Sequence, residues 1–376
     1  MLPTAPTLTD EILAKPLTLA SIDYLLKRKN QQFEDAILYD KSEQITLQTV
    51  GRNVNLRAII EFSNACALDC DYCGIRKSSD VERFLLDRET ILGLAQKAID
   101  MGYPGLLLQA GEIVTQGRVD FVADLAREIK KMATKQYSKE QGFRIIGSIG
   151  ELSFGQYKQL KDAGIDRYLL RIESSNPELY AKIHPKEQRF YARDACLDKL
   201  KALDFMVGTG VLIGLPEQTT YDLARDIMYF KRKGADMIGM GPYLPAKGTP
   251  LAEKYDRKQI ETNLHTENLF DTIKRMIAVN RIYNPKANIS ATTAMETIQA
   301  NGRVEAIKAG ANVVMPVLTP QENKVKYSLY EGKNDVKSSL DILKNQIESA
   351  GRTMDLTIAG DPLSWVEHLN AKHRSK

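Results

Sequence analysis

Leu56-Arg57-Ala58-Ile59-Ile60-Glu61-Phe62 is a short apolar run, and it ends just before Cys66-Ala67-Leu68-Asp69-Cys70-Asp71-Tyr72-Cys73. Three of the four cysteines of this 376-residue chain lie in the second stretch. They are too clustered to be incidental and too few to form a disulfide framework. Clustered cysteines of a reducing compartment bind metals or take part in catalysis. We therefore predict that Cys66, Cys70 and Cys73 are ligands of a metal centre.

Seven similar apolar runs follow the first one, with helix-forming segments between them. The runs are residues 105–109, 144–149, 167–173, 208–213, 236–240, 288–292 and 312–317. The helical segments are residues 88–101, 119–132, 154–163, 192–203, 220–233, 267–282 and 297–309. Apolar strands that alternate with helices of about ten to fifteen residues indicate a parallel sheet built from βαβ units. Eight such units predict an α/β fold of the (β/α)8 TIM-barrel type, with a doubly wound open sheet as the alternative.

The sequence suggests three parts. Residues 1–54 contain two apolar-periodic stretches, 12–26 and 33–47, and are predicted to form an N-terminal helical cap. Residues 55–320 are predicted to form the barrel, which is a usual length for this fold. The chain becomes more polar after Pro320, so we expect residues 321–376 to be a C-terminal extension packed on the barrel.

The composition is that of an ordinary globular protein, with 43% hydrophobic residues, 27% charged residues and a net charge of +4. It indicates neither disorder nor nucleic-acid binding. No apolar run approaches the roughly 18 residues that cross a bilayer, so we expect no membrane segment. Residues Met1-Leu2-Pro3-Thr4 do not begin a basic stretch followed by an apolar core. No secretion signal is therefore expected, and a cytoplasmic location is predicted.

In a barrel of this type the loops after the strands form the functional face, and residues 64–77 follow the first strand. Three thiolates can occupy three of the four ligand positions of an iron–sulfur cube, leaving one iron open. A zinc site is the alternative, with Cys196 as a fourth thiolate. Structural zinc sites usually draw their ligands as two close pairs, however, and Cys196 lies within the predicted helix 192–203. An ordinary buried thiol is the favoured interpretation of Cys196.

The spacing Cys-x3-Cys-x2-Cys, with Tyr72 just before the last cysteine, resembles the signature of the radical S-adenosylmethionine (SAM) superfamily. The resemblance implies a [4Fe–4S] cluster on Cys66, Cys70 and Cys73, with Tyr72 beside the cofactor. It implies that SAM binds the open iron and is cleaved reductively to a 5′-deoxyadenosyl radical. An external electron donor, such as a flavodoxin or a ferredoxin-like protein, and an anaerobic setting are implied as well.

Segments at other strand ends resemble the SAM-binding features of that superfamily. The resemblance assigns the SAM amino group to the Gly111-Glu112 pair, SAM contacts to Glu173, and the SAM carboxylate to Arg193. It places Gly214 in a turn that supports adenine and Met240 where the backbone contacts adenine. A turn with a solvated glutamate and surface salt bridges are the alternative interpretations of these residues.

A match that covers nearly the whole chain from residue 56 to residue 333 includes five longer strings that resemble the HydE family of radical SAM maturases, which act on [FeFe]-hydrogenase. They are residues 57–64, 166–171, 238–242, 291–295 and 310–316. The resemblance implies hydrogenase maturation, or a related reaction on a small sulfur- or amino-acid-derived substrate, which in HydE is organometallic. It implies other hydrogenase maturases as partners. It also implies a substrate end formed by Thr292, Thr293, Met315, Tyr327 and Tyr330, with core threonines and packed tyrosines as the alternative.

The chain departs from that family near the expected substrate. Family members typically have serine, aspartate and histidine where this chain has Ala110, Ile113 and Ile172, and threonine in place of Ser174. We therefore expect a retained radical generator with an altered substrate site. Two other functions remain open, namely an amino-acid mutase or lyase like methylornithine synthase, and a non-catalytic carrier of a cluster or metal. Biotin synthase is disfavoured because its second cluster needs more cysteines than this chain has.

Overall fold

The computed structural model describes residues 7–27, 32–138 and 142–374. Its central element is a parallel sheet whose spatial order, β2-β3-β4-β5-β6-β7-β8, is also the order of the strands in the chain. The strands are β2 (Ala58–Ser63), β3 (Gly105–Ala110), β4 (Arg144–Ser148), β5 (Arg167–Leu169), β6 (Met206–Ile213), β7 (Met237–Pro242) and β8 (Asn288–Ile289). Sequential pairing of this kind is what successive βαβ units produce.

The eighth predicted strand, residues 312–317, joins the two edges of this sheet. It contains β9 (Val313–Val314), which bridges in parallel to Ser290 just after β8. Val317 bridges in parallel to Ile59 of β2. The TIM-type barrel is therefore confirmed, and the open doubly wound sheet was the wrong alternative.

One predicted strand is shorter than expected. The run 167–173 pairs regularly only over β5, and the chain rejoins its neighbour through an isolated bridge between Glu173 and Val211. Glu173 has a φ of 59°, which few residues other than glycine adopt. The backbone therefore turns at Glu173 instead of continuing as a strand.

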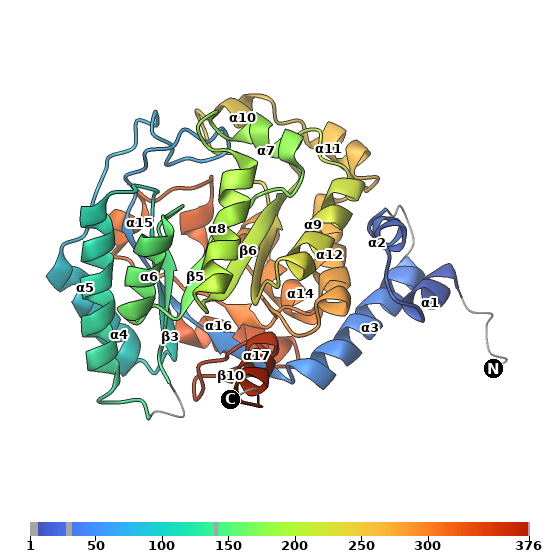
Figure 1. Cartoon of the computed structure of the whole chain (residues 1–376). Helices are drawn as coiled ribbons and strands as arrows, with labels where there is room; N and C mark the ends of the chain where they lie inside the picture. Colours follow the sequence, from blue (N-terminus) through green and yellow to red (C-terminus); the bar gives the residue numbers. More distant parts are fainter. Residues whose placement is uncertain (1–6, 28–31, 139–141, 375–376) are drawn as a thin grey trace.

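Helices surround the ring of strands (Figure 1). The connecting helices are α4 (Arg88–Asp100), α5 (Gln116–Ala133), α6 (Phe154–Asp162), α8 (Phe190–Ala202), α9 (Thr220–Arg232), α12 (Leu269–Tyr283), α13 (Thr293–Ile298) and α14 (Gly302–Lys308). The predicted helix 297–309 is in fact α13 and α14, separated at Asn301, whose φ is 63°. Short helices lie over one end of the barrel in Figure 1, namely α7 (Pro177–Ile183), α10 (Pro250–Glu253) and α11 (Arg257–Asn263).

Side-chain caps explain where several of these helices begin. The side chains of Ser153 and Thr219 each accept a hydrogen bond from the backbone N–H three residues later. The side chains of those later residues, Gln156 and Asp222, accept a hydrogen bond from the backbone N–H of Ser153 and Thr219, which completes a capping box at each helix. A cap of this kind stabilises a helix by about 1 kcal/mol. Residues close in sequence therefore determine where α6 and α9 begin. Both helices follow loops at the functional face of this fold.

The N-terminal helices are α1 (Leu8–Leu13), α2 (Leu19–Leu26) and α3 (Gln32–Thr49). α2 and α3 pack on the outer helices α9 and α12, and α1 packs on α3, to one side of the ring (Figure 1). The predicted helix 12–26 is interrupted between α1 and α2, where Pro16 cannot donate a backbone hydrogen bond. Residues 1–6, on which the expectation about a secretion signal depended, lie outside the described residues.

The C-terminal part spans both ends of the barrel. It comprises α15 (Gln321–Lys324), the 3-10 turn η1 (Lys333–Asp335), α16 (Leu340–Ser349), β10 (Thr353–Asp355) and α17 (Leu363–Arg374). β10 pairs with β1 (Asn53–Leu56), which leads directly into β2. α17 and β10 lie at the end opposite to α7 and α10 (Figure 1). In the described part of the chain, no helix has the length and apolar character needed to cross a membrane.

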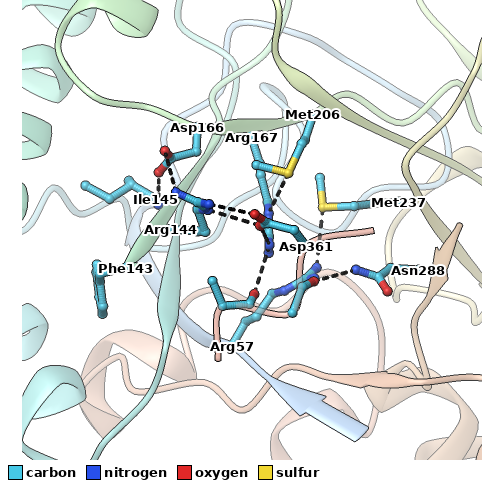
Figure 2. A network of polar contacts seen from close by, with 12 residues as sticks. Arg57, Phe143, Arg144, Ile145, Asp166, Arg167, Met206, Met237, Asn288 and Asp361 are labelled. Atoms are coloured by element: carbon cyan, nitrogen blue, oxygen red, sulfur yellow. Dashed lines mark hydrogen bonds and ion pairs between the residues drawn. The ribbon is translucent and has the colours of Figure 1, made fainter. Parts of the chain in front are cut away.

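A polar network closes this opposite end of the barrel (Figure 2). Asp361 binds Arg144 and Arg167, the first residues of β4 and β5, each at 2.6 Å. Arg57, just before β2, donates to the Gly360 carbonyl at 3.0 Å. The segment around Asp361 therefore lies across the amino ends of the strands.

Candidate functional site

A cavity of about 400 Å³ lies inside the ring. It extends from the cysteine loop after β2 to Arg57 and Asn288 near the amino ends of the strands. The predicted site residues on its wall are Cys66, Cys70, Tyr72, Cys73, Gly111, Glu112, Glu173, Arg193, Thr292, Thr293, Met315, Tyr327 and Tyr330. The fold thus gathers residues from almost the whole barrel sequence around one space.

Two predicted cofactor residues do not line this cavity. Met240 is fully buried in the hydrophobic core, whereas the residues on either side of it, Gly239 and Gly241, line the cavity. Gly214 lies beyond the end of β6, where an added Cβ would contact Leu269 on the outer side. The prediction for Met240 concerned its backbone, and its carbonyl does contact the predicted site residue Thr292.

The three clustered cysteines are free thiols. Burial raises the pKa of all three, and it raises the pKa of Cys73 to about 12. The thiolate form that binds metals therefore needs a nearby positive charge, which a metal centre provides.

The thiols suit an iron–sulfur cluster better than a single zinc ion. Within residues 7–27, 32–138 and 142–374, no group of three or more Cys, His, Asp or Glu side chains could hold one metal ion. A zinc ion needs its sulfur ligands about 2.3 Å away, whereas a four-iron cluster separates its ligands further. Cys196 is 3% exposed, donates to the Leu152 carbonyl and is not on the cavity wall. The structure therefore does not support the zinc alternative.

Close backbone contact holds the cysteine loop against the loop after β3. The backbone N–H of Ala67 donates to the Glu112 carbonyl at 2.8 Å. A Cβ on Gly111 would lie only 2.4 Å from the Ala65 carbonyl oxygen and 2.9 Å from Cys66 Cβ. Only glycine fits at position 111, so this residue sets the distance between the two loops.

Tyr72 is held by a histidine that the sequence analysis did not identify. The Tyr72 hydroxyl lies 3.3 Å from His184 Nε2, and His184 Nδ1 lies 2.9 Å from the Tyr180 carbonyl. Burial and the charge of Arg193 lower the pKa of His184 to about 3, so the ring is neutral. Nδ1 therefore donates to the carbonyl, and Nε2 accepts the Tyr72 hydroxyl proton. The one signal in the sequence was a histidine directly after the short helix α7.

Arg193, from the first turn of α8, connects two carboxylates. Its Nη1 lies 2.9 Å from Glu151 and 3.2 Å from Glu112, and its Nε donates to the Arg171 carbonyl at 2.7 Å. Glu151 was missed in the sequence, although it follows β4 in the same way that Glu112 follows β3. The Glu151 backbone N–H also donates to the Glu112 carboxylate at 2.9 Å. The three charged side chains therefore form one fixed unit near the cysteines.

Arg171 and Glu173 form a second charged pair on the cavity wall. Arg171 Nε and Nη2 each donate to the Glu173 carboxylate at 2.8 Å, a bidentate arrangement, and Nη2 also donates to the Val211 carbonyl. The positive φ of Glu173 costs about 1–3 kcal/mol. Strain of this kind persists where the surrounding structure enforces it, and it is frequent at functional sites.

Gly150 offers a direct test of the Glu112 position. Its φ is 101°, and a Cβ there would lie 2.1 Å from Glu112 Cγ. Gly150→Ala should therefore displace Glu112 and weaken SAM binding by about tenfold or more, the loss expected for a charge-assisted hydrogen bond. Isothermal titration of the reconstituted protein with SAM measures this change.

Gly155→Ala is the matched control, because a Cβ at Gly155 in α6 would meet nothing within 4 Å. This control should bind SAM like the wild type. Unchanged SAM affinity in Gly150→Ala would show that Glu112 does not contribute to the site.

The predicted substrate residues also place polar groups on the cavity wall. The Tyr327 hydroxyl accepts a hydrogen bond from Gln109 at 3.2 Å, and the Thr292 hydroxyl donates to the Met240 carbonyl at 3.5 Å. Glu61 and Lys333 also lie on this wall, and the sequence analysis did not single them out. Hydroxyl, amide and charged groups of these residues therefore line the same cavity as the cysteines.

The departures from the HydE pattern lie in different environments. Ala110 lines the cavity, whereas Ile113 does not. Ile172 is fully buried in the hydrophobic core, and Ser174 is buried where it accepts a hydrogen bond from Asn176. The interpretation of Ile172 as a group near the substrate was therefore wrong, because its neighbours Arg171 and Glu173 point inward and Ile172 points outward.

Comparison with known proteins gives consistent matches. Residues 60–230 match the model of the radical SAM superfamily. The chain is 36% identical over 331 residues to the [FeFe] hydrogenase maturase subunit HydE of Thermotoga maritima, covering 88% of each chain. It is 25% identical over 338 residues to the 3-methylornithine synthase of Methanosarcina acetivorans, covering 88% of this chain and 87% of the relative.

A solved structure shows the same fold. The crystal structure of methylornithine synthase (PylB) superposes with a TM-score of 0.76 at 22% identity, covering 93% of this chain and 97% of that one. The two chains thus share one fold over nearly their full lengths.

Proposed function

The chain belongs to the radical SAM superfamily as a HydE-like enzyme, and from this premise we propose that it cleaves SAM reductively at a [4Fe–4S] cluster held by Cys66, Cys70 and Cys73. We propose [FeFe]-hydrogenase maturation, or a closely related reaction on a small sulfur- or amino-acid-derived substrate, as its task. The observation that carries the proposal is that the three thiols share one cavity with the fixed units around Arg193 and Arg171.

When bound, the cluster supplies the electron that splits SAM into methionine and a 5′-deoxyadenosyl radical. The chain's own residues bind and orient SAM. Glu112 and Glu173 offer carboxylates to its ammonium group, and Arg193 offers a cation to its carboxylate. Tyr72, held by His184, packs beside the cysteines.

Anaerobic reconstitution tests this proposal. The protein should take up about four irons per chain, and its cluster spectrum should change when SAM is added. With a chemical reductant it should form 5′-deoxyadenosine, which chromatography measures directly. A colourless zinc protein, or a loaded cluster that yields no 5′-deoxyadenosine, would contradict the proposal. The second result would favour a carrier of a cluster or metal.

The similarity to 3-methylornithine synthase supports an amino-acid mutase or lyase as the second candidate. The source genome distinguishes the two. A genome that encodes an [FeFe] hydrogenase and companion maturases supports maturation, whereas a genome without them supports the mutase. The proposed electron donor, a flavodoxin or ferredoxin-like protein, is tested by replacing the chemical reductant with each purified protein in turn.

Ala110 is the departure that the structure places on the cavity wall. Ala110→Ser would return the hydroxyl that HydE proteins typically carry there. If the substrate is that of HydE, maturation activity should rise by up to about tenfold, the effect of one well-placed hydrogen bond. An in vitro hydrogenase maturation assay measures this. Unchanged or lower activity would instead indicate a different substrate.

A further inference from the structure

Glu61 and Lys333 form a buried ion pair on the cavity wall, and nothing in the SAM chemistry above uses either residue. Lys333 Nζ lies 2.7 Å from Glu61 Oε1, and the two residues are 6% and 2% exposed. Glu61 belongs to β2 and Lys333 begins η1. The pair therefore connects the first strand of the ring with the C-terminal part.

The surrounding structure fixes the pair. Lys333 Nζ also donates to the Tyr327 carbonyl at 3.0 Å and lies 5.0 Å from the centroid of the Tyr327 ring. The backbone N–H of Glu61 donates to the Thr319 hydroxyl at 2.7 Å. Gln109 donates to the Tyr327 hydroxyl, so these side chains form a continuous polar wall. Lys333 and the Glu61 backbone are thus held from several sides, and Lys333 is the ion-pair partner of the Glu61 carboxylate.

One oxygen of this carboxylate has no partner. Lys333 occupies Oε1, whereas Oε2 is buried and accepts no hydrogen bond from the described residues. A buried acceptor without a partner costs about 1–3 kcal/mol, and such groups in folded proteins usually have a specific reason. Glu61 itself lines the cavity, and the last torsion of a glutamate varies broadly, so the carboxylate can present Oε2 to a ligand bound there. The structure thus provides an acceptor that a ligand can satisfy.

The charges around Glu61 restrict the net charge that such a ligand can carry. Lys333 already neutralises Glu61, so a cationic ligand would leave an excess positive charge. The same cavity contains Arg57, which hydrogen-bonds to the Gly360 carbonyl and the Met237 sulfur. An anionic ligand would be repelled by Oε2. A neutral group with an N–H or O–H is the remaining chemistry that satisfies Oε2 without adding charge.

We propose that Glu61 is a specificity-determining residue whose Oε2 accepts a hydrogen bond from a neutral N–H or O–H group of the substrate, with Lys333 as its positioning residue. The inference rests on the proposed function in that this cavity is taken as the substrate site. It deepens that function by requiring a neutral donor, such as a hydroxyl or an amide N–H, on the substrate.

Isomeric probe pairs test this directly on the reconstituted, SAM-bound enzyme. Butan-1-ol and 1-methoxypropane have the same composition but differ in the O–H donor, and butanamide and N,N-dimethylacetamide differ in the N–H donor. Ligand-observed NMR titration gives the dissociation constants. The wild type should bind at least one donor about tenfold more tightly than its isomer, and the preferred pair identifies the donor as O–H or N–H.

The double variant Glu61→Leu/Lys333→Met removes the acceptor and its counter-charge together, so no unpaired charge is left buried. It should bind both members of each pair equally. Glu61→Gln retains a weaker, neutral acceptor and should show an intermediate preference. The control Glu82→Leu/Lys326→Met removes an ion pair outside the cavity and should keep the wild-type preference.

Two results would overturn the inference. In the first, the wild type shows no preference within either pair. In the second, the preference persists unchanged in Glu61→Gln and in the double variant. Formation of 5′-deoxyadenosine by the wild type is measured separately without probes. Its absence would refute the proposed function, whereas its presence without donor preference would refute only the role of Glu61.

Discussion

Cys70→Ala is expected to lose the cluster and, with it, the formation of 5′-deoxyadenosine from SAM. Cys70 is 8% exposed on the cavity wall, and no other cysteine apart from Cys66 and Cys73 lies there. No spare thiol can therefore replace it. Changes to the surroundings of a metal ligand already lower activity about 10–100-fold, so removing a ligand should exceed that loss. Iron content and 5′-deoxyadenosine yield after anaerobic reconstitution measure the effect.

Cys196→Ala is the matched control for this experiment. Cys196 is buried beside Leu152 and away from the cavity, so its removal should leave iron content and activity close to the wild type. Persistent 5′-deoxyadenosine formation in Cys70→Ala would refute its role as a ligand. Equal loss in Cys196→Ala would indicate that the cluster depends on all four cysteines.

Asp361→Asn is expected to lower the free energy of unfolding by about 3–5 kcal/mol, the usual effect of removing one partner of a buried ion pair. Asp361 binds both Arg144 and Arg167, and Arg167 is completely buried (Figure 2). The neutral amide would leave two cations at the amino ends of the strands without their shared carboxylate. Chemical denaturation monitored by circular dichroism measures the change.

Asp162→Asn is the control for Asp361→Asn. Asp162 pairs with Lys158 on the surface of α6, where both side chains are more than half exposed. Exposed pairs of this kind contribute about 0–1 kcal/mol, so the control should be nearly neutral. A similarly small effect of Asp361→Asn would show that the network in Figure 2 does not hold the C-terminal segment in place.

The contribution of Asp361 should also depend on pH. Burial by itself would raise the pKa of Asp361, but hydrogen bonds and charges from Arg144 and Arg167 outweigh it and hold the pKa below its usual range. An aspartate has a pKa of about 3.9 in the unfolded chain. The stabilisation is therefore fully present above about pH 4 and is lost as the pH falls through the lower folded-state pKa.

The difference in unfolding free energy between wild type and Asp361→Asn should consequently be constant from about pH 8 to pH 5 and shrink below about pH 4. Denaturation at a series of pH values measures this difference. A difference that already shrank between pH 8 and pH 6 would show that another group carries the effect.

Local sequence patterns were sufficient to predict most of the strands and helices of the barrel. Apolar runs, helical periods and side-chain caps such as Ser153 and Thr219 depend on neighbours only a few residues away, so they can be read along the chain. The same holds for the cysteine spacing, because all three cysteines lie in one loop. The strand over 167–173 was mispredicted, since the turn at Glu173 depends on its pairing with Val211 and Arg171.

The sequence by itself determined the barrel, the cysteine loop and the kind of chemistry that such a loop supports. Only the tertiary structure decided which polar side chains share the cavity with it. His184, Glu151, Glu61 and Lys333 carry no distinctive local pattern, and Ile172 was assigned to the wrong face. Whether a side chain faces the cavity or the core depends on strand twist and on contacts between segments far apart in the chain, which local sequence does not encode.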